Sequence, residues 1–353
     1  MAKTIMIMAG GTGGHVFPGL AVADELRGRG WRVVWLGAPG GMEATLVPQR
    51  GYEMAWVSFS GLRGKGLTAF ALLPLRLLLA FGQAARAIFA HRPDVVLGMG
   101  GYQSFPGGMM AALLGRPLVI HEQNSVAGLA NRVLAGVADR ILCGFPGALK
   151  NGTVTGNPVR PDITGLAAPA MRYDGRSGRL NLLVVGGSLG AKVLNETLPQ
   201  AIALMPPERR PEVTHQSGAQ HIHTLAQRYR EAGVNANTVA FIDDMASAYA
   251  GADLVLCRAG ALTCSELAAA GVASILVPFP HAVDDHQTGN ARHLARAGAA
   301  ILLPQPELTP ERLAGLLAKL SREQLRDMAA KARAQALPEA TQAVARTCME
   351  VAG

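Results

Sequence analysis

The sequence predicts an α/β protein of two similar domains, each built on a parallel sheet with helices on both faces. A chain of 353 residues has room for roughly two domains of ordinary size. An apolar strand, a glycine turn and a helix follow one another from residue 4, and the same arrangement returns from residue 181. Helical segments separate most of the other apolar strands, which is typical of parallel sheets.

The elements of the two halves can be placed by their apolar runs. In the first half we expect strands at residues 4–9, 32–36, 54–59, 94–97 and 117–121, a glycine turn at residues 10–14 and a helix from Pro18. In the second half we expect strands at residues 181–185, 213–215, 239–242, 253–256 and 274–277, a turn at residues 186–190 and a helix from Ala191. Two prolines within residues 156–161 indicate a hinge, and a cleft is expected between the halves.

Composition narrows the classes of protein and partner. Hydrophobic residues make up 49% of the chain and charged residues 16%, which excludes a disordered protein. The net charge of +8 suits a phosphate ligand, a nucleic acid or an acidic lipid surface, but 5% aromatic residues and dispersed charge disfavour nucleic acid. The apolar run at residues 5–9 is too short for a signal peptide, and the four cysteines form no C-x-x-C pair. We therefore expect a reducing, cytoplasmic environment.

Three glycine-rich loops follow predicted strands, at residues 10–14, 98–108 and 186–190, and each either makes a tight turn or holds a ligand. The first departs from the dinucleotide pattern because Val16 stands where the third glycine belongs, and no carboxylate ends the second strand. The loop at 186–190 lacks the Gly-Lys-Ser/Thr of a P-loop, yet a diphosphate can still bind at the helix that follows. Three such loops favour two phosphorylated ligands.

Other polar motifs allow two interpretations. Thr263 and Glu266 have capping-box spacing, which favours a helix start at Thr263, although Glu266 can instead accept hydrogen bonds from a ribose diol. Polar residues 121–124 end an apolar strand, where they face a crevice or satisfy buried groups. The chain has no Asp-x-Asp, and the histidines of residues 221–223 lack nearby partners, so we expect no metal.

Seven motifs follow one another through nearly the whole chain: GGTGGHVFP at residues 10–18, GMGGY at 98–102, HEQN at 121–124, GNPVR at 156–160, GGSLGA at 186–191, FIDDM at 241–245 and RAGALTCSE at 258–266. In this order they resemble the bacterial glycosyltransferases that form lipid II. The resemblance implies a GT-B fold, in which two Rossmann-like domains with parallel sheets face each other across a cleft. It places an acceptor and membrane-binding domain at residues 1–158 plus a returning helix at 338–353, and a UDP-sugar domain at 159–337.

The resemblance also implies an activity, with its partners and site. N-acetylglucosamine would move, with inversion and without a cofactor, from UDP to the C4 hydroxyl of the muramoyl sugar of lipid I. The enzyme would lie peripherally on the cytoplasmic face of the cell membrane, on an anionic lipid surface and near other cell-wall synthesis proteins. Gly100, Gly101 and Tyr102 would bind the acceptor. The donor would be bound by Thr12, Gly13, Gly14, Asn124, Arg160, Ser188, Ile242, Ala261, Leu262, Thr263, Cys264, Ser265, Glu266 and Gln287. Some members carry a Gln-Gln pair where this chain has His286-Gln287, so only Gln287 is carried over.

The proposed displacement requires a base for the acceptor hydroxyl and stabilisation of the departing diphosphate. His15 beside the first glycine loop is the candidate base, with an orienting role as the equal alternative and Glu122 in reserve. Helix N-termini and Arg160 would stabilise the diphosphate without metal. A UDP-N-acetylglucosamine 2-epimerase-like enzyme and a noncatalytic nucleotide-sugar sensor remain the alternatives.

The apolar segment at residues 70–81 is a candidate membrane contact. As a helix it would measure about 18 Å, too short for a hydrocarbon core of about 30 Å. A buried helix is the commoner outcome for such a segment, but the lipid-linked acceptor favours an exposed patch on acidic lipid. The patch would comprise Leu72, Leu75 and Leu79 with Arg76.

Overall fold

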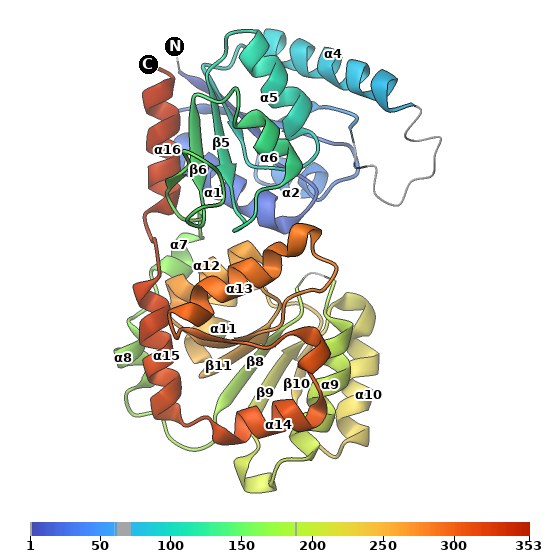
Figure 1. Cartoon of the computed structure of the whole chain (residues 1–353), viewed down its shortest axis with the longest axis vertical. Coiled ribbons are helices and arrows are strands. Elements are labelled where there is room, and N and C mark those ends of the chain that lie inside the picture. Colours follow the sequence, from blue (N-terminus) through green and yellow to red (C-terminus); the bar gives the residue numbers. More distant parts are fainter. Residues whose placement is uncertain (1, 60, 62–71, 188) are drawn as a thin grey trace. The chain divides into compact units, whose positions relative to one another are not determined.

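The computed structural model describes residues 2–59, 61, 72–187 and 189–353 (Figure 1). They divide into two compact units, the first comprising residues 1–160 with 337–353 and the second residues 161–336. The expected boundaries, after residues 158 and 337, lie within two residues of these divisions.

The first unit is built on a seven-stranded parallel sheet in the order β3-β2-β1-β4-β5-β6-β7. Ile5 on β1 pairs with Val33 on one side and Val95 on the other. The strands are β1 Thr4–Met8, β2 Arg32–Gly37, β3 Glu53–Trp56, β4 Val95–Gly98, β5 Leu118–Glu122, β6 Arg140–Cys143 and β7 Thr153–Val154. The last two were not expected, because their few residues carry little apolar pattern.

Helices cover both faces of this sheet, as expected (Figure 1). Ile5 and Ile7 pack in one core with Val344 of the last helix, whereas Met6 and Met8 point to the opposite core. The helices are α1 Gly13–Gly28, α2 Glu43–Gln49, α4 Leu73–His91, α5 Ser104–Leu113, α6 Leu129–Leu134 and α16 Ala340–Val351. The C-terminal helix therefore packs on the unit that also contains the N-terminus.

The second unit repeats the plan with six parallel strands in the order β10-β9-β8-β11-β12-β13. The strands are β8 Asn181–Val185, β9 Glu212–Gln216, β10 Asn237–Val239, β11 Leu254–Cys257, β12 Ala273–Leu276 and β13 Ala300–Leu302. The strand expected at 239–242 begins two residues earlier and ends at Val239, and β13 was missed. Both are short edge strands whose residues are not all buried, so their apolar signal is weak.

The helices of the second unit include α9, which follows its glycine-rich loop, and α12, which follows Gly260. The α-helices are α7 Pro161–Thr164, α8 Pro169–Tyr173, α9 Lys192–Ala203, α10 Ile222–Glu231, α11 Met245–Gly251, α12 Ala261–Ala270, α13 His286–Arg296, α14 Pro310–Lys319 and α15 Arg322–Ala334. Short 3₁₀ turns lie at Pro207–Arg209, Ala219–His221, Val283–Asp285 and Gln305–Glu307.

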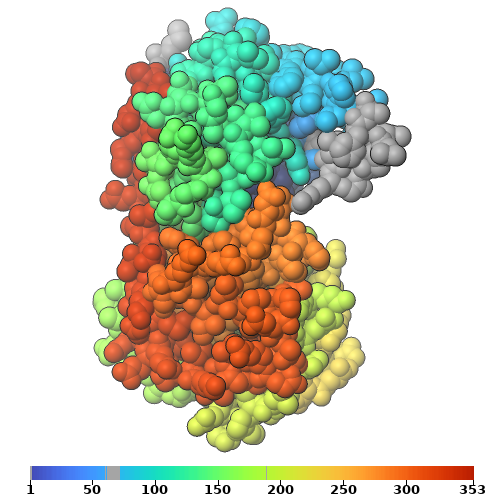
Figure 2. Space-filling view, in the orientation of Figure 1, coloured from blue at the N-terminus to red at the C-terminus, as the bar shows by residue number. Residues whose placement is uncertain are grey.

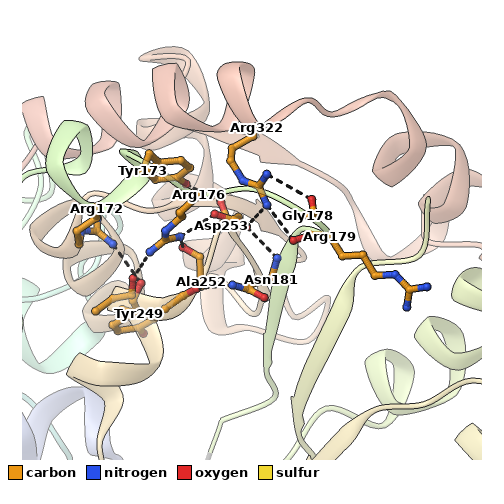
Figure 3. A network of polar contacts seen from close by, with 12 residues as sticks. Arg172, Tyr173, Arg176, Gly178, Arg179, Asn181, Tyr249, Ala252, Asp253 and Arg322 are labelled. Atoms are coloured by element: carbon orange, nitrogen blue, oxygen red, sulfur yellow. Dashed lines mark hydrogen bonds and ion pairs between the residues drawn. The ribbon is translucent and has the colours of Figure 1, made fainter. Parts of the chain in front are cut away.

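A buried aspartate joins the amino ends of the two central strands in the second unit (Figure 3). Asp253 accepts from the Asn181 N–H at 2.9 Å and forms ion pairs with Arg176 at 2.6 Å and Arg322 at 3.3 Å. Two cations and a backbone donor compensate its loss of hydration. In the first unit Asp94 accepts from the Thr4 N–H at 2.7 Å in the same way, so the repeat extends to this detail.

Candidate functional site

The two sheets place the glycine loops at equivalent points. In each unit the strand order reverses beside the first strand, between β1 and β4 and between β8 and β11. Ligands of open parallel sheets bind at the carboxyl ends of the strands at such a reversal. The loops at 10–14 and 98–108 follow β1 and β4, and the loop at 186–190 follows β8. The structure therefore brings each predicted loop to the position where this fold binds ligands.

The first loop is shorter than expected because α1 begins at Gly13 rather than at Pro18. Thr12 is the extended N-cap, and its carbonyl accepts from the N–H groups of His15 and Val16 at 3.1 Å each. Val16 is buried in the core, and this burial outweighs the poor helix propensity of the glycines. Gly13 and Gly14 thus form the helix N-terminus, where backbone N–H groups lack intrahelical acceptors.

His15 lies between the glycine loops at residues 10–14 and 98–108. Its Nδ1 is 3.1 Å from the Gly10 carbonyl oxygen. Because a carbonyl can only accept, Nδ1 carries the hydrogen, and Nε2 is the basic nitrogen of the neutral ring. Gly100 has a φ of +96°, and a Cβ there would lie 2.8 Å from the imidazole Cδ2. The candidate base and the candidate acceptor loop are therefore in direct contact, and Tyr102 of that loop is exposed.

Glu43, which the sequence analysis missed, holds both of these loops. Its buried carboxylate accepts from the N–H groups of Gly11 and Ala38 at 3.1 Å each and from Gln103 Nε2 at 3.4 Å. These donors come from the loop at residues 10–14, the end of β2 and the loop at residues 98–108. An acidic residue at the start of a short helix is common on protein surfaces, so its sequence neighbours carry no sign of this role.

Glu122 organises the loop after β5. Its two carboxylate oxygens accept from the N–H groups of Asn124 and Gly128 and from the side chains of Asn124 and Asn131, at 2.8–3.2 Å. With four donors around one buried carboxylate, this geometry favours a positioning role over that of a reserve base. Asn124 is held by the same contacts.

Hydrogen bonds connect the HEQN motif at residues 121–124 with the GNPVR motif at residues 156–160. His121 donates from Nε2 to the Gly156 carbonyl at 2.9 Å, and Asn157 donates to the Gln123 carbonyl at 3.0 Å. Burial lowers the pKa of His121, so this histidine is a neutral structural group. Arg160 is half-buried and ends the GNPVR motif directly before α7.

Gln216 at the end of β9 holds the second unit's glycine loop. Its Oε1 accepts from the N–H groups of Gly186 and Gly187 at 3.0 and 3.1 Å, and its Nε2 donates to the Gly187 and Ala240 carbonyls. Helix α9 starts at Lys192 after an extended Ala191, close to the expected start. Ser188, the predicted diphosphate contact, lies outside the described residues.

The predicted capping box at Thr263 is wrong. Gly260 is the extended N-cap of α12, and its carbonyl accepts from the Cys264 N–H at 2.9 Å, so the helix begins at Ala261. Ala261 and Cys264 are buried, and packing of this face extends the helix ahead of Thr263. Glu266 is therefore a buried mid-helix carboxylate, which accepts from the Tyr249 hydroxyl at 3.1 Å.

The remaining donor residues lie in two segments of the second unit. Half-buried Ile242 lies between β10 and α11. Gln287 in the first turn of α13 accepts from the Phe279 N–H through Oε1 at 2.9 Å, and Nε2 is its donor end. His286 donates from Nδ1 to the Val283 carbonyl at 2.7 Å. Leu262 and Ser265 of α12 are half-buried.

Among the described residues, no three His, Cys, Asp or Glu side chains are grouped closely enough to hold a metal ion. The predicted donor residues are divided between the units: Thr12, Gly13, Gly14, Asn124 and Arg160 belong to the first, and the others to the second.

Comparison with known proteins agrees with this architecture. Residues 5–143 match the glycosyltransferase family 28 N-terminal domain, and residues 181–347 match its C-terminal domain. The chain is 67% identical over 350 residues to the UDP-N-acetylglucosamine–N-acetylmuramyl-(pentapeptide) pyrophosphoryl-undecaprenol N-acetylglucosamine transferase of Azoarcus sp. strain BH72, covering 99% of this chain and 98% of that relative. The protein of the same name from Dechloromonas aromatica strain RCB is 64% identical over 352 residues, covering 100% of both chains.

A solved structure gives the same result. The crystal structure of Acinetobacter baumannii MurG has a TM-score of 0.86 and 42% sequence identity, covering 99% of both chains. The two parallel-sheet units and this likeness confirm the expected GT-B fold. The chain therefore belongs to glycosyltransferase family 28, among the UDP-N-acetylglucosamine–N-acetylmuramyl-(pentapeptide) pyrophosphoryl-undecaprenol N-acetylglucosamine transferases.

Proposed function

We propose that this chain transfers N-acetylglucosamine from UDP-N-acetylglucosamine to the C4 hydroxyl of the muramoyl sugar of lipid I, forming lipid II for peptidoglycan synthesis. The observation that carries the proposal is identity of 60–67% over nearly the whole chain to relatives named for this transfer. The matched regions cover 99–100% of this chain and so span the glycine loops of both units. Its substrates are thus UDP-N-acetylglucosamine and lipid I.

The geometry of the first unit suits the acceptor half of the reaction. In an inverting displacement the C4 oxygen attacks the anomeric carbon, its proton passes to a base, and UDP departs with the bonding electron pair. His15 Nε2 is the proton acceptor, because Nδ1 donates to Gly10. The N-terminus of α9 and Arg160 would stabilise the diphosphate as negative charge develops.

Turnover of labelled UDP-N-acetylglucosamine with lipid I tests this function. We expect labelled lipid II and one UDP per transfer, with equal rates in EDTA and in added Mg²⁺. Epimerisation of the donor without acceptor, or binding of the donor with no turnover, would contradict the proposal. Loss of activity in EDTA with recovery on Mg²⁺ would contradict only the metal-independent step.

We further propose that α4 places the enzyme on the anionic cytoplasmic surface of the membrane. Leu72, Leu75, Leu78 and Leu79 are 47%, 56%, 68% and 58% exposed, so a buried helix does not describe this face. Leu113 of neighbouring α5 is also exposed, and Arg76 and Arg86 are exposed on α4. Figure 2 shows α4, in light blue, at the surface of the first unit. An apolar strip with flanking cations suits the boundary between headgroups and acyl chains.

The length estimate for this helix needs correction. Residues 70 and 71 lie outside the described residues, and α4 continues to His91. Its 19 residues measure about 28 Å and are, by length and composition, apolar enough to cross a membrane. Its opposite face, which includes Ala80, Ala84 and Ile88, packs in the core of the first unit. This packing supports a helix that lies on the membrane instead of crossing it.

A pair of substitutions that adds negative charge to α4 tests the membrane contact. Leu75→Glu with Leu79→Glu should lower cosedimentation with anionic vesicles at least about tenfold, because two apolar side chains leave the lipid boundary. The matched control, Met171→Glu with Leu204→Glu, adds the same charge at exposed positions of the second unit. UDP affinity and circular dichroism should stay unchanged in both. Equal losses in the two pairs, or loss of folded protein in the α4 pair alone, would contradict the membrane assignment.

A further inference from the structure

Glu43 and His15 are connected through a single peptide group. The Gly11 N–H donates to Glu43 Oε2 at 3.1 Å, and the Gly10 carbonyl accepts from His15 Nδ1 at 3.1 Å. This N–H and this carbonyl are the two ends of the same amide. The chain of hydrogen bonds therefore runs from the carboxylate through the Gly10–Gly11 peptide to the imidazole.

The surroundings of Glu43 are built for a carboxylate. Among the described residues, its hydrogen-bond partners on Gly11, Ala38 and Gln103 are all N–H donors, which an acceptor-only group matches and a carboxamide does not. Side chains at Gly10 or Gly41 would overlap the carboxylate, and a Cβ at Gly37 would lie 2.9 Å from Glu43 Cγ. Glycines of three different segments thus leave the space that this buried side chain fills.

Such a connection affects the imidazole in two ways. A carboxylate that accepts from one end of an amide polarises the carbonyl at the other end, because hydrogen bonds in series strengthen one another. The Gly10 oxygen then becomes a better acceptor for His15 Nδ1–H, which holds the tautomer with Nε2 basic. When Nε2 takes a proton, the resulting cation is stabilised by the carboxylate beyond the peptide. A directly bonded carboxylate does the same for the histidine of a catalytic triad.

We propose that Glu43 is a positioning residue that acts on His15 through the Gly10–Gly11 peptide. In the reaction, the C4 O–H bond breaks and the Nε2–H bond forms, while the new C–O bond at the anomeric carbon replaces the bond to UDP. The proton stays on His15 until it passes to solvent. This inference rests on the proposed function for its kinetic consequence, whereas its structural consequence can be measured without any substrate.

The structural consequence is the tautomer of His15, which ¹⁵N NMR of histidine-labelled protein reports. The His15 signals are assigned by their loss in His15→Gln. At a pH where the ring is neutral, we expect the wild type to hold hydrogen on Nδ1 and Glu43→Gln to populate both tautomers. Hydrogen on Nε2 in the wild type, or an unchanged tautomer in folded Glu43→Gln, would overturn the proposal. Neither result would bear on whether the enzyme transfers N-acetylglucosamine.

The kinetic consequence is a loss in kcat that leaves donor binding intact. Removing the outer partner of a metal-bound histidine typically costs about 10- to 100-fold, and we expect Glu43→Gln to lower kcat by a comparable factor with donor KM within about twofold. Glu43→Asp retains acceptor-only chemistry, so its kcat should lie between those of the wild type and Glu43→Gln. An unchanged kcat in Glu43→Gln would overturn the proposal.

Asp94→Asn is the matched control. Asp94 also accepts a backbone N–H of β1, from Thr4 at 2.7 Å, but at the opposite end of the strand. Its substitution should lower stability without changing the His15 tautomer or kcat. If Asp94→Asn lowered kcat as much as Glu43→Gln, the effect would come from general loosening of β1, and the proposal would fall. If Glu43→Gln does not fold, the wild-type tautomer and Glu43→Asp still decide the question.

Discussion

The two units hold their first glycine loops with different side chains. Glu43 supports the loop after β1 and brings a negative charge beneath it, whereas Gln216 supports the loop after β8 and is neutral. Both are buried, and both accept from loop N–H groups. A carboxylate beneath a loop repels an anion and stabilises a nearby cation, while a carboxamide leaves the loop open to an anion. The same fold therefore provides one loop suited to a protonated histidine and one suited to a diphosphate.

The largest expected effect comes from removing the imidazole of His15, which lies beside the loop that Glu43 supports. His15→Ala should lower kcat by roughly 10²- to 10⁴-fold, the usual contribution of positioned proton transfer. The donor KM should change little, because the diphosphate is assigned to the N-terminus of α9 and to Arg160, not to His15. Steady-state kinetics across the pH range measures both constants. Near-normal kcat would show that the ring only orients a substrate, and Glu43 would then lose its role as well.

Reversing the difference between the loops is the second test. Gln216→Glu places a carboxylate beneath the second unit's glycine loop, at residues 186–190. It should weaken UDP binding about tenfold or more, a change of about 1.4 kcal/mol. Gln216→Met is the uncharged control: like Gln216→Glu it lacks the Nε2 donor to the Gly187 and Ala240 carbonyls, and it also lacks the acceptor for the loop N–H groups. Calorimetry with UDP and with uridine separates phosphate from nucleoside contacts. Equal losses in both variants, or equal losses for both ligands, would show that charge is not what distinguishes the loops.

The loops themselves were predictable from the sequence, but their supports were not. Glycines directly after an apolar strand are a local signal, and both strand-turn-helix repeats lie where residues 4–14 and 181–191 placed them. Glu43 and Gln216 meet their loops from 32 and 29–30 residues away, across neighbouring strands. Only the strand order brings them there, and strand order is a tertiary property.

The starts of two helices were predicted wrongly for a related reason. The helices at Gly13 and Ala261 both start earlier than local residue preferences suggest. Buried residues near the first turn are held by the core: Val16 in α1, and Ala261 together with Cys264 in α12. Proline at a first turn and capping-box spacing are preferences of about 1 kcal/mol, and burial of an apolar side chain contributes more.

The third prediction, with a smaller expected effect, concerns Glu266, a buried carboxylate of the second unit. Glu266→Ala should raise the donor KM about tenfold if the carboxylate binds the ribose diol, since two hydrogen bonds to a charged group are lost. Its helix-capping role is already ruled out by the start of α12 at Ala261. Tyr249→Phe is the control, because it removes only the hydroxyl that donates to Glu266. KM values that rise equally in both variants would assign Glu266 to packing with α11 instead of to the donor.

The smallest expected effect concerns the strand that carries Gln216. His215 precedes it on β9, is fully buried, and bonds to the Tyr229 hydroxyl through Nδ1 at 2.9 Å. Burial lowers its pKa from 6.5 to about 3. Between these values the unfolded chain binds a proton that the folded chain does not, so stability is complete above pH 6.5 and falls as the pH drops toward 3.

His215→Gln removes this titration and retains a side chain that can bond to Tyr229. Each pH unit in the window should cost the wild type about 1 kcal/mol more than the variant. Hydrogen exchange of β9 amides at pH 6.5 and 5 measures that difference in the strand that carries Gln216. The wild type and His215→Gln both retain His121, whose pKa burial also lowers. Exchange of β5 amides in the first unit should therefore show the same acid sensitivity in the two proteins. A change at β5 that matched the one at β9 would mean that the His215 substitution acts on the whole chain and that the second loop's support is not separately sensitive to acid.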